Sequence, residues 1–261
     1  MATPMIVSTL ASATIEDIAA CSRGVKWLQL YWQGRREHNL ALVRRAEQAG
    51  YEAIVVTVDA PLAGIRNRQQ RMGFVLPPHV QAVNLAAGSA PSTAQGIATV
   101  FDRLIADAPT WADISWLVQA TTLPVIVKGI LDAEDARQAI AAGVAAIIVS
   151  NHGGRVLDGV LPALTALPAV VAAVNGAAPV LLDGAIRRGS DVFKALALGA
   201  SAVLIGRAYI HALATAGALG VAHLLRTVRE ELEITMALCG CANPAAIGRH
   251  TIIAAGGIDL V

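Results

Sequence analysis

Apolar residues occur along this chain in short continuous runs, and several runs follow a segment that ends in glycine. One layout recurs at 49–56, 142–149 and 198–205: an apolar residue and a glycine, two further residues, and then four apolar residues. Glycine often ends a helix because it adopts the left-handed conformation without steric cost. An uninterrupted apolar run rich in β-branched residues is typical of a strand covered on both faces. Repeated units of this kind predict a parallel sheet with helices packed on it.

Read in this way, the whole chain predicts seven buried strands. We expect them near residues 5–8, 27–31, 53–59, 125–128, 146–150, 180–183 and 202–205. Helices are expected at 38–49, 133–142, 191–198 and 219–238. Thr110 and Asp113 have the spacing of a capping box, which predicts the start of another helix. A closed (β/α) barrel needs eight strands, so the pattern favours either an open, doubly wound sheet or a barrel that lacks one strand.

The stretch between Pro61 and Pro109 does not follow this alternation and is rich in glycine, proline, glutamine and alanine. A connection of this length inside a compact domain is usually a functional lid or a disordered segment. We therefore predict a long active-site loop at 62–109 within a single domain that spans 1–261.

Composition narrows the class of protein. The 261 residues are 55% hydrophobic and 15% charged, with a formal net charge of +1, which favours neither nucleic acid nor an acidic membrane surface as a partner. The longest run without charge, 159–182, is interrupted by prolines, so no membrane span is expected there. No basic segment precedes Glu16, and the three cysteines lack metal-ligand spacing. We expect a cytoplasmic protein without a signal peptide, disulfide or metal site.

Polar and ionisable residues gather where the predicted strands end, although charge is scarce elsewhere. The clearest case is Ser-Asn-His-Gly-Gly-Arg at 150–155, directly after the run 146–149. An imidazole can exchange a proton near neutral pH, and a guanidinium can hold a carboxylate through two hydrogen bonds. Other strand ends carry Ser8, Gln29, Tyr31, Thr57, Asp59, Lys128, Asp183, Arg187, Gly206 and Arg207. In barrel enzymes the active site lies at the carboxyl ends of the strands, so we expect these residues to form one site.

Some of these residues indicate a particular chemistry. The segment 183–190 leads into a helix and Gly206-Arg207 follows the next strand, as in barrels that bind phosphate after their last two strands. Lys128 is compatible with a Schiff-base nucleophile or with a fixed positive charge beside an anionic cofactor. Asp59 could orient His152, as a carboxylate does for a catalytic imidazole.

Six segments together resemble the FMN-dependent 2-hydroxy-acid oxidases and dehydrogenases, which include glycolate oxidase, lactate oxidase, mandelate dehydrogenase and hydroxymandelate oxidase. The segments are QLYW at 29–32, TVDAP at 57–61, LPVIVKGI at 123–130, SNHGGR at 150–155, DGAIRRGSDVFKALALGA at 183–200 and ELEITMALCG at 231–240. The resemblance extends from about residue 3 to 240 in the order of the family. It implies a TIM (β/α)₈-type barrel with FMN at its C-terminal mouth. It also implies that the chain starts at the family's second strand, as an N-terminally truncated barrel with about seven of eight strands.

The resemblance also implies roles for individual residues. His152 would be the base that removes a proton from the substrate, with Asp59 paired to it, and Tyr31 would hydrogen-bond the substrate oxygen. Arg155 and Arg66 would hold the substrate carboxylate. Lys128 would stabilise the reduced, anionic flavin. The remaining cofactor-binding residues would be Ser8, Gln29 and Thr57 at the ring, Asp183, Arg187, Gly206 and Arg207 at the ribityl phosphate, and Ser150.

The implied activity is FMN-dependent oxidation of a small (S)-2-hydroxy acid to the 2-oxo acid. The electron acceptor would be oxygen, a quinone or a cytochrome, and the assembly a homotetramer. The alternative is a catalytically silent barrel fragment that no longer binds flavin well. An FMN-dependent isopentenyl diphosphate isomerase would give no reason for His152 and Arg155. Three departures from the family pattern bear on the site. The N-terminal segment that carries a substrate-binding tyrosine and the first strand is missing, Ala185 replaces the second glycine of an Asp-Gly-Gly phosphate loop, and Leu10 replaces an aromatic residue of glycolate oxidase.

Overall fold

The computed structural model describes residues 3–62, 64–85 and 108–253. The chain divides into two compact units. The first unit comprises residues 1–129, 138–145 and 155–158, and the second comprises 130–137, 146–154 and 159–261. Each unit is described by itself, and the single domain stays a prediction. Residues 63 and 86–107 of the expected lid lie outside the described residues.

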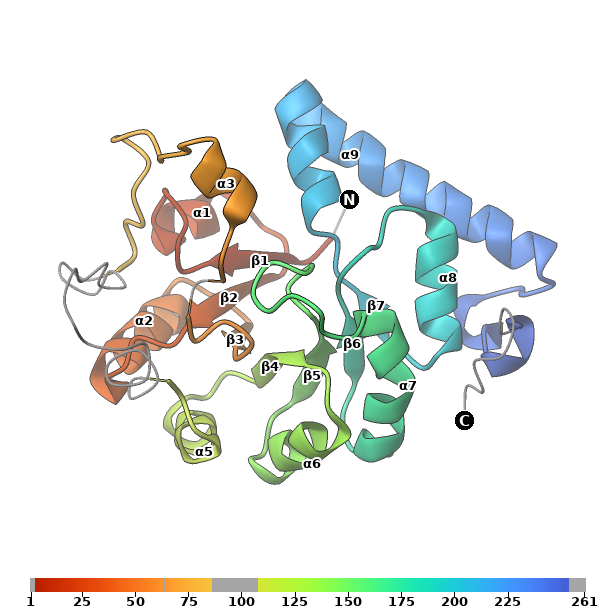
Figure 1. Cartoon of the computed structure of the whole chain (residues 1–261), viewed down its shortest axis with the longest axis horizontal. Coiled ribbons are helices and arrows are strands. Elements are labelled where there is room, and N and C mark those ends of the chain that lie inside the picture. The colour runs from red at the N-terminus through yellow and green to blue at the C-terminus, as the bar shows by residue number, and fades with distance from the viewer. Residues whose placement is uncertain (1–2, 63, 86–107, 254–261) are drawn as a thin grey trace. The chain divides into compact units, whose positions relative to one another are not determined.

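The first unit contains a parallel sheet whose four strands lie side by side in chain order (Figure 1). The strands are β1 (Met5–Ser8), β2 (Lys26–Tyr31), β3 (Ala53–Thr57) and β4 (Val125–Ile130). The connecting helices are α1 (Ile15–Cys21), α2 (Arg36–Gln48) and α5 (Trp111–Ala120). Every residue of β3 is buried, as expected for a strand covered on both faces. A short helix, α3 (Asn67–Arg71), lies in the segment that follows β3.

The strand register of this sheet aligns polar residues at the carboxyl ends of the strands. Ser8 of β1 pairs with Gln29 of β2. Tyr31 of β2 pairs with Thr57 of β3, which in turn pairs with Lys128 of β4. Because residues two apart in a strand point to the same face, Gln29 and Tyr31 share the face of this row. The register thus brings four predicted cofactor residues and Tyr31 onto one face of the first unit.

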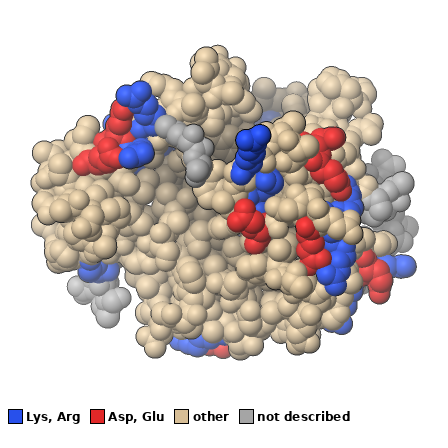
Figure 2. Space-filling view, turned by 180° about the vertical axis from the view of Figure 1, so that it is seen from behind, with Lys and Arg blue, Asp and Glu red and all other residues tan. Residues whose placement is uncertain are grey.

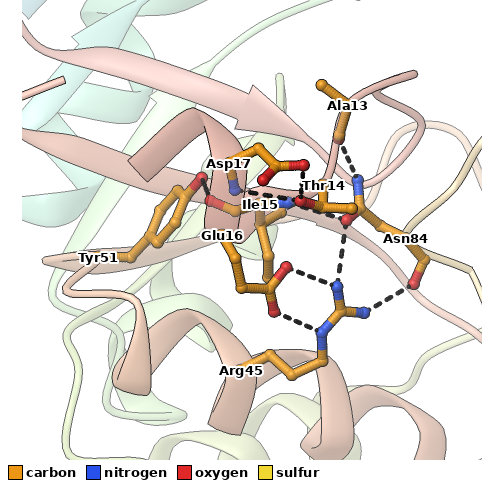
Figure 3. A network of polar contacts seen from close by, with 8 residues as sticks. All are labelled: Ala13, Thr14, Ile15, Glu16, Asp17, Arg45, Tyr51 and Asn84. Atoms are coloured by element: carbon orange, nitrogen blue, oxygen red, sulfur yellow. Dashed lines mark hydrogen bonds and ion pairs between the residues drawn. The ribbon is translucent and has the colours of Figure 1, made fainter. Parts of the chain in front are cut away.

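A buried asparagine fastens the end of the described lid segment to the body of the first unit (Figure 3). Asn84 is 2% exposed, its Nδ2 donates to the carbonyl of Ala13 at 3.0 Å, and its Oδ1 accepts from the N–H of Ile15 at 3.0 Å. Arg45 of α2 donates to Asn84 Oδ1 and O at 3.3 and 3.2 Å and binds the Glu16 carboxylate at 2.8 and 2.9 Å. The segment after α3 is therefore held at Asn84 by α1 and α2.

The second unit also has parallel strands, β5 (Ala146–Val149), β6 (Val180–Leu182) and β7 (Ala202–Val203). Its helices are α7 (Ala163–Val174), α8 (Gly189–Ala197) and α9 (Arg207–Leu238), followed by the 3-10 turns η1 (Pro244–Ala246) and η2 (Arg249–Thr251). Helix α6 (Ala133–Ala141) contributes residues to both units. Helices α8 and α9 meet closely, because a Cβ on Gly189 would lie 2.0 Å from the backbone nitrogen of Leu232. Phe193 and Met236 are buried in the apolar cluster between these helices.

All seven predicted strands are present in the described residues, and the capping box is confirmed. The later strands are shorter than predicted: β7 ends at Val203, although Leu204 N still donates to the carbonyl of Leu182 at 2.8 Å. The last helix is longer than predicted and begins at Arg207. Ala216 and Gly217 leave the helical conformation inside it, so the predicted helix 219–238 corresponds to its second part.

Two properties of the surface bear on possible partners. By length and composition alone, α9 is apolar enough to cross a membrane, which is weak evidence for a span, and the expected absence of a span stays a prediction. Figure 2 shows few charged side chains on the face that it displays, and acidic and basic groups there lie next to one another. This mixture agrees with the net charge of +1.

Candidate active site

A chain of hydrogen bonds links the polar ends of three strands in the first unit. Ser8 Oγ donates to Gln29 Oε1 at 2.9 Å, and Gln29 Nε2 donates to Thr57 Oγ1 at 2.9 Å. Gln29 is 8% exposed and Thr57 is 4% exposed, so these bonds are shielded from water. Because both ends of the Gln29 amide are engaged, its orientation is fixed. A polar row held in this way can hydrogen-bond the edge of a flat heterocyclic ligand.

Tyr31 lies in the field of three charged residues of the first unit. Burial raises the pKa of its hydroxyl, the Asp59 carboxylate raises this pKa further, and Arg66 and Arg155 act in the opposite direction. The net result is a Tyr31 pKa above its ordinary value of 10.0, so the hydroxyl remains a hydrogen-bond donor at neutral pH. Arg66 and Arg155, both predicted to bind substrate, are thus near enough to act electrostatically on Tyr31.

Two glycines that sequence reasoning did not single out allow segments that carry predicted site residues to approach one another closely. A Cβ on Gly64 would lie 2.4 Å from the carbonyl oxygen of Val156 and 2.6 Å from that of Arg155. The segments that carry Arg66 and Arg155 therefore meet backbone to backbone. A Cβ on Gly129, which has φ +116°, would lie 2.6 Å from Asp59 Cβ. Gly129 directly follows Lys128 at the predicted end of a strand, where a close backbone approach can be expected, whereas no local pattern marks Gly64.

In the second unit, His152 occupies a left-handed turn directly after β5. His152, Gly153 and Gly154 have φ values of 54°, 65° and 69°. Ser150 Oγ accepts from His152 N at 3.0 Å, and Asn151 Oδ1 accepts from Gly153 N at 3.1 Å. A non-glycine residue with positive φ is uncommon, and such residues cluster at functional sites. The turn places the predicted base at a carboxyl strand end.

The predicted phosphate residues occupy two loops of the second unit. Gly184 and Ala185, after β6, both have positive φ, at 96° and 59°. Gly206 is the N-cap residue of α9 and provides no side-chain cap, and a Cβ there would meet no atom within 4 Å. Uncapped N–H groups in the first turn of a helix attract anions, and Arg207 adds a cation in that turn. Arg207 Nη2 also donates to the carbonyl of Gly153 at 3.0 Å, so this loop contacts the His152 turn.

The predicted site residues are divided between the two units. The first unit holds Ser8, Gln29, Tyr31, Thr57, Asp59, Arg66, Lys128 and Arg155. The second unit holds Ser150, His152, Asp183, Arg187, Gly206 and Arg207. The pairing of Asp59 with His152 joins residues of different units and stays a prediction. The described part of the chain contains no group of three or more His, Cys, Asp and Glu side chains that could hold a metal ion.

Comparisons with known proteins give the relationship of the whole chain. The sequence profile of the family described as FMN-dependent dehydrogenase matches residues 1–254. The chain is 50% identical over 251 residues to an L-lactate oxidase of Alicycliphilus denitrificans, a match that covers 95% of this chain and 69% of that protein. It is 50% identical over 249 residues to a 4-hydroxymandelate oxidase of Amycolatopsis orientalis, covering 94% and 70% of the two chains.

A solved structure of a mandelate oxidase variant with a C4a-hydroxy FMN adduct has a TM-score of 0.82 and 47% identity. That match covers 94% of this chain and 68% of the oxidase. The fold class is therefore α/β, of the TIM-barrel type, with seven parallel strands in the described residues. The chain belongs to the family of FMN-dependent 2-hydroxy-acid oxidases and dehydrogenases, and it spans about two-thirds of the length of these relatives.

Proposed function

We propose that this chain binds FMN and oxidises a small (S)-2-hydroxy acid to the corresponding 2-oxo acid. The observation that carries the proposal is the close backbone contact between the segments that bear Arg66 and Arg155, together with the electrostatic influence of both arginines on the Tyr31 hydroxyl. Guanidinium groups bind carboxylates through paired, charge-assisted hydrogen bonds. A neutral phenol beside them can donate to a neighbouring hydroxyl or carbonyl oxygen. This combination matches the two adjacent functional groups of a 2-hydroxy acid.

The residues that are present fit both ends of FMN. The hydrogen-bonded row of Ser8, Gln29 and Thr57 offers hydrogen bonds to a flat ring. Lys128 of β4 pairs with Thr57 of β3 and so lies beside this row. The uncapped start of α9 at Gly206 and the exposed Arg207 offer donors to a phosphate. Asp183, Arg187 and Ser150 complete the proposed cofactor residues. When bound, FMN supplies the acceptor for the two electrons that leave the substrate.

The chain's own residues would bind and deprotonate the substrate. Arg66 and Arg155 hold the carboxylate, and Tyr31 donates a hydrogen bond to the substrate oxygen. His152 accepts a proton at its imidazole as the hydroxy acid loses two electrons and two protons in all. Lys128 supplies positive charge where negative charge develops on the electron acceptor. Oxygen, a quinone or a cytochrome would then take the electrons onward.

A spectroscopic experiment tests this function directly. The purified chain, supplied with FMN, should show flavin absorbance near ~450 nm that bleaches anaerobically on addition of L-lactate or (S)-mandelate. Protein that takes up no FMN, or bound flavin that neither acid reduces, would overturn the proposal and favour the silent-fragment alternative. D-Lactate and (R)-mandelate are the matched controls, because the proposed site is specific for one enantiomer.

Replacing the proposed base tests its role. His152→Gln should retain FMN and lower the rate of flavin reduction by about 10²–10⁴-fold, the usual contribution of a general base. Stopped-flow absorbance under anaerobic conditions measures this rate. His38→Gln, at an exposed position on α2, is the control and should reduce flavin normally. Reduction of the His152→Gln protein at the wild-type rate would contradict the assignment.

A further inference from the structure

The turn that carries His152 needs support from neighbouring side chains. Three consecutive residues, 152–154, have positive φ, and the first of them is not glycine. The left-handed conformation is disfavoured for residues with a Cβ, because that atom approaches the following carbonyl oxygen. A side chain in such a turn keeps one direction only if hydrogen bonds hold the backbone in place. The direction of the His152 imidazole therefore depends on the residues that brace this turn.

Asn151 braces the turn and connects it to two other loops of the second unit. Its Oδ1 accepts from Gly153 N at 3.1 Å, and its backbone carbonyl accepts from Gly154 N at 2.9 Å. On the other side, its Nδ2 donates to the carbonyl of Leu161 at 3.4 Å, in the loop before α7. Asn151 Oδ1 also lies 3.5 Å from the place that a Cβ on Gly184 would occupy. The amide thus packs against the loop that follows β6.

We propose that Asn151 is a positioning residue for the base, which it serves by fixing the left-handed turn that directs His152. The proposal rests on the proposed function, since it takes His152 as the base. Asn151 is better suited to a test than Ser150, which also braces the turn through His152 N. Ser150 is 0% exposed, so replacing it would disturb the packing around it as well as the turn. Asn151 is half-buried and its two hydrogen-bonding atoms can be separated by substitution.

Two variants separate the acceptor and donor of Asn151. Asn151→Ala removes both, whereas Asn151→Asp keeps an oxygen that can accept from Gly153 N and loses the donation to Leu161. Asn243→Ala is the matched control, because Asn243 Oδ1 likewise accepts a local backbone N–H, that of Ala246 at 3.1 Å in η1. A merely structural role would make the Asn151→Ala and Asn243→Ala proteins behave alike.

The first measurement does not depend on activity. Hydrogen exchange at the Gly153 amide, followed by NMR, should be about five- to tenfold faster in Asn151→Ala, as expected for loss of one hydrogen bond. Asn151→Asp should restore the slow exchange, and Asn243→Ala should leave Gly153 unchanged. The imidazole resonances of His152 should shift or broaden in Asn151→Ala alone. Unchanged Gly153 exchange and unchanged His152 resonances in that variant would overturn the proposal.

The second measurement uses the FMN-loaded chain. Asn151→Ala should lower the rate constant of flavin reduction about tenfold, with little change in the affinity for FMN or in KM, and Asn151→Asp should recover most of that rate. A wild-type reduction rate in Asn151→Ala would overturn the positioning role even if Gly153 exchanged faster. If the wild-type chain binds FMN but no hydroxy acid reduces it, the proposed function fails. In that case the exchange and imidazole measurements still decide whether Asn151 holds the turn.

Discussion

At the scale of single residues, the site depends on positions where the presence or absence of a Cβ atom decides which backbone conformation is favourable. Ala185 has φ 59°, although the left-handed region favours glycine. The family pattern has glycine at this place in the phosphate-type loop, which agrees with the conformation that Ala185 adopts. At Gly64 the glycine is present and is required, since a methyl group there would collide with the backbone of Val156. Each position gives a prediction.

Ala185→Gly should stabilise the chain. The left-handed conformation costs a non-glycine residue about 1–2 kcal/mol, and the greater freedom of glycine in the unfolded chain offsets about 0.4–1 kcal/mol of that gain. We expect the free energy of unfolding to rise by up to about 1 kcal/mol, measured by urea denaturation. Ala169→Gly, exposed inside α7, is the control and should lower this free energy by about 1 kcal/mol. An Ala185→Gly protein as destabilised as the control would contradict the strain at residue 185.

Gly64→Ala should weaken substrate binding. The added Cβ would push the segment of Arg66 away from the segment of Arg155, because the atoms it meets are backbone carbonyl oxygens. We expect KM for the hydroxy acid to rise about tenfold or more, with FMN affinity nearly unchanged. Gly24→Ala is the control, since a Cβ there meets only ordinary contacts, at 3.6 Å and beyond. An unchanged KM in Gly64→Ala would argue against a shared carboxylate site.

At the scale of elements, local patterns predicted the strands and most helices well. An apolar run and the glycine before it are adjacent in sequence, so the pattern at 142–149 could be read without knowing what surrounds it. Helix α5 was predicted from its cap at Thr110 for the same reason, because the capping residues are three positions apart. The attachment of the lid segment was not predicted. Asn84 binds Ala13 across 71 positions of sequence, and no periodicity records such a contact.

Asn84→Ala should destabilise the first unit. The substitution removes hydrogen bonds to Ala13 and Ile15, and it leaves the buried N–H of Ile15 and the part-buried carbonyl of Ala13 without this partner. We expect a loss of about 2–3 kcal/mol in the free energy of unfolding and earlier proteolysis of the segment after α3. Gln81→Ala, an exposed change in the same segment, should alter stability by less than about 0.5 kcal/mol. Equal effects of the two variants would show that Asn84 does not anchor the segment.

At the scale of the whole molecule, acid should act first on the first unit. Hydrogen bonding to Arg45 lowers the pKa of Glu16 below its ordinary 4.5. Burial raises the pKa values of Glu47 and Asp113, but hydrogen bonds from Thr121, Thr110 and nearby arginines outweigh it and lower both. A carboxyl with a lowered folded pKa contributes stability above its unfolded pKa and loses it as pH falls through the folded value. In the second unit, burial raises the pKa of Asp135, and the charges of Asp132 and Glu134 raise it further. A carboxyl with a raised folded pKa has the opposite effect, because its contribution to stability becomes more favourable as pH falls.

Tryptophan fluorescence can follow this difference, because all four tryptophans (27, 32, 111 and 116) belong to the first unit. As pH falls below about 4.5, we expect fluorescence to report unfolding before far-UV circular dichroism reports loss of the remaining helices. Arg45→Gln should lower stability at neutral pH and make the acid dependence shallower, since Glu16 loses its partner. Coincident transitions by both probes would indicate that the units unfold together.

The amino-acid sequence was sufficient to predict the alternation of strands and helices, the parallel sheet and the presence of polar residues at the strand ends. These features follow from signals that lie within about ten residues of one another, such as apolar runs, capping pairs and glycine at helix ends. The assembly of the site within each unit became visible only in three dimensions. The contact of Gly64 with Val156 and the bracing of the His152 turn by Asn151 depend on loop backbones that meet in space. Close packing between distant segments leaves no periodic trace in the sequence, because a single small residue or a single amide is enough to permit it.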